Sequence, residues 1–246
     1  MHHPIAGDPA HRSIVVLTGA GISVESGLPS FRGAGRLWAG WRLEEVATPE
    51  AFAREPQTVQ RFYDLRRRQL QDPEVRPNAA HDALARLERR WPGELLIVTQ
   101  NIDDLHERAG SRNVVHMHGE LLKARCLACS GVHEWRGDLA APHACPGCAR
   151  PDALRPHVVW FGEMPLQLQA IDHALGRCDL FVAIGTSGSV YPAAGFVEEV
   201  RRHGRADTLE LNLERSAAGS RFAERREGLA TLLVPRWVEE LLCGRT

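Results

Sequence analysis

Short apolar runs alternate with longer amphipathic stretches along most of this chain. The apolar runs have the length of buried strands and cover residues 14–17, 95–99, 180–184, 209–213 and 231–234. Helical periodicity marks residues 49–70, 81–90, 166–175, 193–202 and 235–242. Because strands that alternate with helices form a parallel sheet, the pattern predicts an α/β fold with helices on both faces of the sheet.

One region interrupts this alternation. Residues 123–154 contain four cysteines, several glycines and prolines, and no helical pattern. The cysteines form two C-x-x-C pairs, Cys126 with Cys129 and Cys145 with Cys148, separated by 15 residues. This spacing is typical of a zinc ribbon, in which four thiolates close the coordination shell and make the metal structural. Free core cysteines are the alternative.

The insert divides the chain into two predicted units. Residues 13–122 and 155–246 would form the sheet domain, and residues 123–154 a small zinc-binding module. The helical segment 39–80 would contribute to the smaller lobe. A chain of 246 residues is long enough for one domain with such an insert.

Composition excludes several classes of partner. A net charge of -1 with 25% charged residues predicts no specific nucleic-acid binding and no membrane-surface binding. No apolar stretch approaches the roughly 20 residues that cross a bilayer, and the first residues lack the apolar core of a secretory signal. We therefore expect a cytoplasmic protein, in which paired cysteines indicate metal binding because the compartment is reducing. We also expect the protein to be a monomer.

A glycine turn follows the first predicted strand. Gly19 and Gly21 would let the backbone approach a ligand, and a helix expected to begin near Ile22 would point its N-terminal N–H groups at a phosphate. A tight turn without a ligand is the alternative, because Val24 replaces the third glycine of a G-x-G-x-x-G fingerprint. The breaker-rich stretch 27–35 that follows indicates a ligand-covering loop.

Polar residues follow three later strands. Gln100, Asn101 and Asp103 come directly after residues 95–99, at the carboxyl end where open α/β sheets bind ligands. An ordinary helix cap by Asn101 or Asp103 is the alternative. Two further polar stretches, residues 185–189 and 212–214, end the strands at 180–184 and 209–213, where a ribose and an adenine would be held.

Two histidines flank a short strand-like stretch, residues 113–115. His118 could act as a general base near neutral pH. Because His116 and His118 are two residues apart, they would point to opposite faces if the strand continues, and at most one would face a ligand. A structural role is the alternative for either ring.

Together these motifs resemble the sirtuin family of NAD-dependent protein-lysine deacylases, over residues 13–242. The resemblance rests on motifs in the family's order: Gly19-Ala20-Gly21-Ile22-Ser23, Gln100-Asn101-Ile102-Asp103, His118-Gly119, the four cysteines, Phe161-Gly162-Glu163, Gly185-Thr186-Ser187 and Asn212-Leu213-Glu214. Within the family the sequence is most similar to the bacterial CobB type. The resemblance implies a Rossmann-like sheet, NAD as co-substrate and one structural zinc per chain.

The resemblance also implies a reaction and a role for each matched residue. A sirtuin transfers the acyl group of an acylated lysine to ADP-ribose, which releases nicotinamide, O-acyl-ADP-ribose and free lysine. His118 would be the catalytic base. The positions that match cofactor-binding residues are Gly19, Ala20, Gly21, Ser23, Phe31, Arg32, Trp38, Gln100, Asn101, Ile102, Asp103, Gly185, Thr186, Ser187, Asn212, Leu213, Glu214 and Ala230. The positions that match the peptide-pairing segments include Val159, Phe161, Gly162, Glu163 and Val190.

The acyl preference is predicted from one helical stretch. In residues 59–70 a rotation of about 100° per residue puts Tyr63 and Arg66 on the apolar face, with the other arginines at its margin or opposite. A guanidinium on that face requires an anionic partner. Tyr63 and Arg66 match the Tyr-x-x-Arg pair with which desuccinylase-type sirtuins bind an acyl carboxylate. We therefore expect succinyl-, malonyl- or glutaryl-lysine as substrate, with acetyl-lysine also accepted.

Three other functions remain as alternatives. Protein ADP-ribosyl transfer would use the same cofactor cleavage, and a non-catalytic zinc-ribbon binding module would use none. Asn101, Asp103 and His118 together disfavour the second. A hydride-transferring dehydrogenase is disfavoured by Val24 and by the late position of Glu214.

Overall fold

The computed structural model describes residues 12–29, 37–38 and 40–244, and its largest element is a six-stranded parallel sheet. The strands are β1 (Ser13–Thr18), β4 (Glu94–Thr99), β5 (Val114–His116), β9 (Leu180–Ile184), β10 (Asp207–Asn212) and β11 (Glu224–Glu227). Their order is β11-β10-β9-β1-β4-β5, so the order reverses between β1 and β9. Open α/β sheets bind ligands at such a switch point, beyond the carboxyl ends of the strands.

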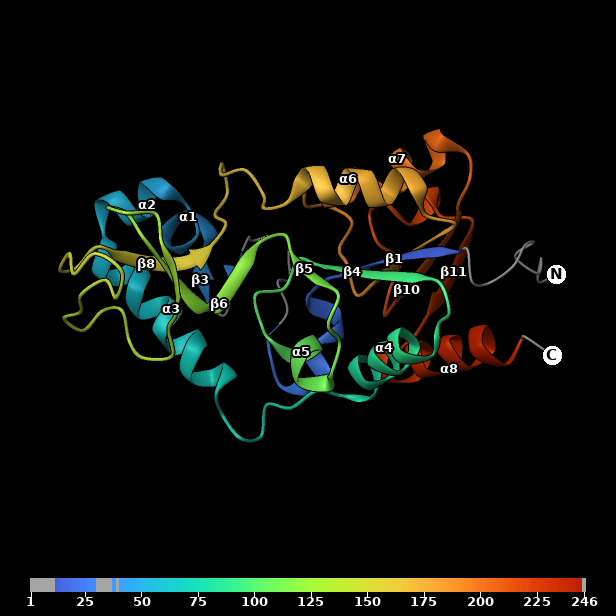
Figure 1. The fold of residues 1–246 in the computed structure, drawn as a ribbon, viewed down its shortest axis with the longest axis horizontal. Helices are drawn as coiled ribbons and strands as arrows, with labels where there is room; N and C mark the ends of the chain where they lie inside the picture. Colours follow the sequence, from blue (N-terminus) through green and yellow to red (C-terminus); the bar gives the residue numbers. More distant parts are fainter. Residues whose placement is uncertain (1–11, 30–36, 39, 245–246) are drawn as a thin grey trace.

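Helices cover both faces of this sheet (Figure 1). α4 (Ala79–Arg90) and α8 (Ala230–Cys243) pack on the face that carries Ile14 and Val16 of β1. α6 (Leu168–Arg177) and α7 (Phe196–His203) cover the face of Val15 and Leu17. Since side chains alternate along a strand, the continuous apolar sequence of β1 fills both cores. The predicted α/β fold is confirmed.

A smaller lobe contains three helices and a three-stranded antiparallel sheet (Figure 1). Its helices are α1 (Leu43–Val46), α2 (Pro49–Arg54) and α3 (Pro56–Leu70), and its strands are β6 (Gly119–Cys126), β7 (Val132–Glu134) and β8 (Leu154–Val158). The short strands β2 (Leu37–Trp38) and β3 (Trp41–Arg42) pair with each other. Phe62 of α3 shares one core with Leu121 of β6 and Val158 of β8, so α3 packs against this antiparallel sheet.

Several sequence-based boundaries were wrong. The single helix predicted over residues 49–70 is two helices, because the chain leaves helical geometry at Glu55 before Pro56. Residues 231–234, expected to form a strand, lie inside α8, which contains Pro235. The sixth strand is instead β11, whose residues are all charged. The helix expected near Ile22 is replaced by two 3-10 turns, Ala20–Ile22 and Val24–Ser26.

The arginines of α3 also differ from expectation at one position. Arg67 was predicted to lie at the margin of the apolar face, yet only 1% of it is exposed. Its guanidinium pairs with Asp64 in the same helix and donates to the carbonyl oxygen of Leu121. A buried charge requires such partners, and α3 is thereby fixed to β6.

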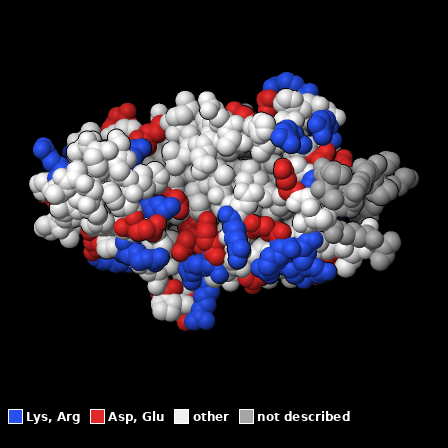
Figure 2. Space-filling view, in the orientation of Figure 1, with Lys and Arg blue, Asp and Glu red and all other residues white. Residues whose placement is uncertain are grey.

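The surface agrees with the absence of strong charge bias in the sequence. Figure 2 shows acidic and basic side chains next to one another along the lower edge of the face in view. Across residues 12–29, 37–38 and 40–244, we find no helix that combines the length and the apolar character needed to cross a membrane.

Candidate active site

A cavity of about 680 Å³ lies at the switch point of the sheet. It is lined by the turns that follow β1, β4, β9 and β10, and by α3 and the segment 158–163 from the smaller lobe. A volume of this size is typical of small-molecule sites, which occur preferentially at such places. The cavity therefore extends from the main sheet to the smaller lobe.

Two glycine turns cross at one wall of the cavity. The N–H of Gly21 donates to the carbonyl oxygen of Gly185 at 2.9 Å, and a Cβ on Gly21 would lie 2.6 Å from the Gly185 Cα. Gly185 has φ of +62°, a conformation that favours glycine. Close packing of two backbones thus explains these glycines. After Gly19 the chain forms a 3-10 turn, Ala20–Ile22, where the sequence predicted the start of an α-helix.

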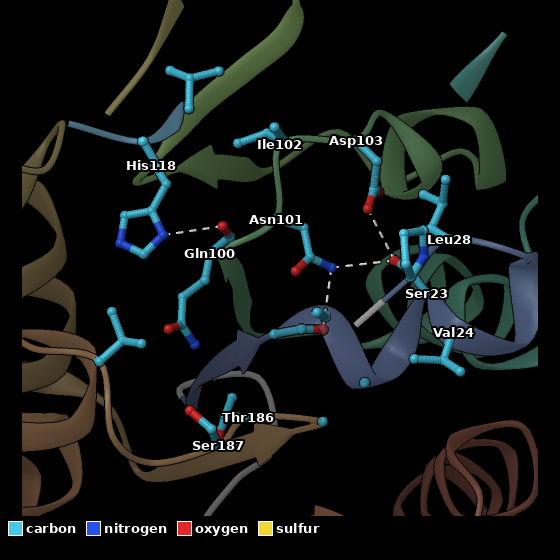
Figure 3. Close-up of a pocket in the computed structure, with 18 of the residues that line it drawn as sticks. Ser23, Val24, Leu28, Gln100, Asn101, Ile102, Asp103, His118, Thr186 and Ser187 are labelled. Carbon is cyan, nitrogen blue, oxygen red and sulfur yellow. Dashed lines mark hydrogen bonds between the residues drawn. The ribbon is translucent and has the colours of Figure 1, made fainter. Parts of the chain in front are cut away.

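A chain of hydrogen bonds joins the turn after β1 to the turn after β4 (Figure 3). The Asn101 amide donates to the Gly19 carbonyl at 3.1 Å and to the Ser23 hydroxyl at 3.2 Å. The Ser23 hydroxyl donates in turn to Asp103 at 3.0 Å. Burial raises the pKa of Asp103 to about 6, although hydrogen bonds from the Leu105 N–H and from Ser23 favour the carboxylate. These polar side chains are therefore held in fixed positions.

Only one of the two predicted histidines lines the cavity. His118 does so, and its Nδ1 lies 3.0 Å from the Gln100 carbonyl oxygen. Burial lowers the pKa of His118, only partly opposed by this hydrogen bond. His116 points away and contacts the Glu107 carboxylate at 2.7 Å and the Asn101 carbonyl. His118 thus faces the cavity, and burial favours its neutral form. His116 is held by Glu107 and by the Asn101 carbonyl instead.

The cavity gathers most of the predicted cofactor residues. Those that line it are Gly19, Ala20, Gly21, Ser23, Gln100, Asn101, Ile102, Asp103, Gly185, Thr186, Ser187, Asn212, Leu213, Glu214 and Ala230. Phe31 and Arg32 lie outside the described residues, and of Trp38 the structure describes the backbone only. The functional roles assigned to these residues remain predictions.

The predicted substrate residues also line the cavity, all from the smaller lobe and the segment 158–163 except Val190, which follows β9. They are Tyr63, Arg66, Val159, Phe161, Gly162, Glu163 and Val190. The Glu163 carboxylate has structural partners, since it accepts hydrogen bonds from Arg155 and from the Trp160 N–H. Sequence analysis missed Trp160, a buried residue that also lines the cavity. An aromatic residue next to the Phe161-Gly162-Glu163 motif was the available signal.

The four predicted metal ligands form one cluster in the smaller lobe. Their sulfur atoms all lie within 4.8 Å of one another, with Cys126 and Cys148 at 3.7 Å and Cys129 and Cys145 at 3.8 Å. Such a set fits tetrahedral zinc with thiolate ligands. Four protein ligands leave no open position, so the cluster is suited to a structural metal, separate from the cavity.

Comparison with known proteins identifies the family, because residues 19–192 match the Sir2 family. The chain belongs to the Sir2 family. An NAD-dependent protein deacylase of Vibrio vulnificus is 58% identical over 232 residues, which cover 94% of both chains. The protein of the same description from Escherichia coli is also 58% identical, over 94% of this chain and 82% of that relative. The resemblance to sirtuins found in the sequence is confirmed.

Solved structures of other Sir2 proteins share this fold. A Sir2 homologue in complex with NAD has a TM-score of 0.86 and 36% identity, covering 100% of this chain and 98% of that one. A mutant homologue with 2′-O-acetyl ADP-ribose has a TM-score of 0.84 and 38% identity, covering 95% of each chain. Sir2 bound to an acetylated peptide has a TM-score of 0.78 and 28% identity, covering 96% of this chain and 94% of that one.

Proposed function

We propose that this chain is an NAD-dependent protein-lysine deacylase that removes succinyl and related dicarboxylic acyl groups as well as acetyl groups. The close relatives named as NAD-dependent protein deacylases support the reaction class. Sir2 structures with NAD and with an acetylated peptide support the two substrates. The products would be nicotinamide, O-acyl-ADP-ribose and free lysine.

The residues of the cavity fit NAD. The Ser23, Asn101 and Asp103 side chains supply fixed hydrogen-bonding groups at the switch point, where dinucleotides bind in this class of fold. The turns that follow β9 and β10 line another part of the cavity and would hold the ribose and adenine. Their residues are Thr186, Ser187 and 212–214. When bound, NAD supplies an electrophilic ribose carbon and a nicotinamide leaving group.

His118 would act as the general base. Its Nδ1 faces a carbonyl oxygen, which can only accept, so Nδ1 carries the proton of the neutral ring and Nε2 carries a lone pair. Because burial lowers the pKa of His118, this neutral form persists at pH 7. The Gln100 carbonyl therefore fixes both the tautomer and the orientation in which His118 accepts a proton from a ribose hydroxyl.

Arg66 is the observation that carries the acyl preference. It lines the cavity, and its Nε is buried without a hydrogen-bond partner among the described residues. Burial lowers the pKa of Arg66, and the Phe62 ring lies 5.5 Å from its guanidinium carbon. An acyl carboxylate in the cavity would supply an anionic partner for this guanidinium, because guanidinium and carboxylate form charge-assisted hydrogen bonds.

The test compares succinyl- and acetyl-lysine peptides of one sequence, with NAD, by mass spectrometry. Arg66→Met is expected to lower the ratio of kcat/KM for succinyl to that for acetyl about 10- to 100-fold, the effect of one charge-assisted hydrogen bond. Arg61→Met, an exposed arginine of the same helix, serves as the matched control. An unchanged ratio in Arg66→Met contradicts the acyl assignment, and ADP-ribosylated protein without O-acyl-ADP-ribose contradicts deacylation.

We also propose a cytoplasmic location, since the four cysteines require a reducing compartment to remain metal ligands. We further propose that the protein is a monomer, which light scattering would test. Acylated proteins or peptides would be the partners, as acetylated peptides are for Sir2 relatives.

A further inference from the structure

One buried hydrogen bond joins the smaller lobe's helix α3 to the segment that borders the peptide site. The indole N–H of Trp160 donates to the Tyr63 hydroxyl at 3.0 Å, and both side chains are buried. An indole nitrogen can only donate. The Tyr63 oxygen is therefore the acceptor in this bond, and the hydroxyl proton has to point away from Trp160.

Trp160 itself is held from two sides. The Arg155 guanidinium carbon lies 3.3 Å from the centre of the Trp160 ring. Glu163 accepts hydrogen bonds from Arg155 and, at 2.8 Å, from the Trp160 backbone N–H. The Phe52 ring is 5.1 Å from the Trp160 ring, centre to centre. With these contacts the indole has one orientation, and the direction of its N–H is fixed.

The Tyr63 hydroxyl keeps its proton in this setting. Burial raises the pKa of Tyr63 well above its ordinary value, more than the hydrogen bond from Trp160 lowers it. Tyr63 and Arg66 are three residues apart on α3, so they are neighbours on the helix surface, and both line the cavity. Tyr63 carries an O–H donor, and Arg66 carries N–H donors.

We propose that Trp160 is a positioning residue for acyl recognition: it occupies the acceptor side of the Tyr63 hydroxyl and so turns the hydroxyl proton toward the carboxylate that Arg66 binds. This inference rests on the proposed desuccinylase function and names a determinant of its specificity. Trp160 lies between Val159 and Phe161, in the segment that would pair with the peptide backbone, so one residue would link peptide docking to acyl selection.

The test is Trp160→Phe, which keeps an aromatic ring under Arg155 and removes the N–H donor together with one ring of the indole. We expect the succinyl-to-acetyl ratio of kcat/KM to fall about fivefold, the effect of one neutral hydrogen bond, mainly through a higher KM for the succinyl peptide. Trp91→Phe is the matched control, because the Trp91 indole N–H also donates a partly buried hydrogen bond, to the Arg12 carbonyl at 3.2 Å. Trp91 does not line the cavity. Its ratio is expected to equal that of the wild type.

A double-mutant cycle separates positioning from general support of the fold. In a Tyr63→Phe background, Trp160→Phe should cause no further fall in the ratio, because the hydroxyl that it orients is gone. Equal losses for both peptides, or an additional loss in that background, would overturn the inference. Absence of succinyl removal by the wild type would overturn the proposed function and the inference with it, whereas normal removal that Trp160→Phe leaves unchanged would overturn the inference alone.

Discussion

The buried ion pair of α3 offers a stability test with a built-in control. Arg67 and Asp64 are 1% and 4% exposed at their side chains and lie 2.6 Å apart. Asp64 also accepts the backbone N–H groups of Leu139 and Ala140, at 2.8 and 2.9 Å. This pair therefore fixes the helix that carries Tyr63 to the chain between the two cysteine pairs.

The perturbation is Arg67→Met, compared with Arg68→Met one residue later. Removing one partner of a buried pair costs about 3–5 kcal/mol, because the other charge is left buried. Here the hydrogen bond to the Leu121 carbonyl is lost as well, while the two backbone N–H groups still stabilise the Asp64 carboxylate. We therefore expect a loss near the lower limit, about 3 kcal/mol. Arg68 pairs with Asp138 at the surface, where ion pairs contribute little, so Arg68→Met should resemble the wild type.

The assay is equilibrium urea unfolding of the zinc-loaded protein, followed by circular dichroism. The double variant Arg67→Met and Asp64→Asn should recover part of the lost free energy of unfolding, because it removes the unpaired charge and keeps an amide oxygen that can accept a backbone N–H in this loop. Equal stability of Arg67→Met and Arg68→Met, or a loss below about 1 kcal/mol, would refute the reasoning from burial.

Two further predictions concern the base and the metal. His118→Gln should lower kcat by about 10²–10⁴-fold, while calorimetry should show unchanged NAD binding. In the wild type, the deacetylation rate should rise with pH through a midpoint below the ordinary histidine pKa, because burial lowers the pKa of His118 and only the neutral ring accepts a proton. A midpoint above pH 7 would contradict this role. Mass spectrometry should show one zinc per chain. Cys126→Ser should lose this zinc, whereas Cys243→Ser, which changes an exposed cysteine of α8, should retain it. Equal zinc content in both variants would contradict zinc binding by the four-cysteine cluster.

The central strands of the sheet could be predicted because they are apolar on both faces, but the edge strand β11 could not. β11 consists of Glu224, Arg225, Arg226 and Glu227, and no hydrophobic pattern marks it. Residues 231–234 were misread because a short apolar run fits a strand or a buried helix equally well. The spacing of Val234, Trp237, Val238 and Leu242, all buried in α8, is helical across Pro235. Reading Pro235 as a helix start hid that periodicity.

Contacts between distant segments limited the prediction of α3. A helical projection correctly separated Arg66, which lines the cavity, from the exposed Arg61 and Arg68. It could not bury Arg67, because Arg67 donates to the distant Leu121 carbonyl, and because its partner Asp64 accepts the N–H groups of residues 139 and 140. The hydrogen bond between Trp160 and Tyr63 was hidden for the same reason, since 97 residues separate the two.

Asp103 shows why a single motif left two interpretations open. One of its carboxylate oxygens accepts the N–H of Leu105, the first residue of α5 (Leu105–Ala109), although the N-cap residue of this helix is Asp104. The other accepts the Ser23 hydroxyl from the turn after β1. The same carboxylate thus contacts both the start of α5 and the turn after β1, because a carboxylate has two oxygens and the strand order brings the turns after β1 and β4 together. The role of Asp103 in cofactor binding stays a prediction. What distinguished a site from a cap was the presence of complementary polar groups at the ends of neighbouring strands, which no one segment of the sequence contains.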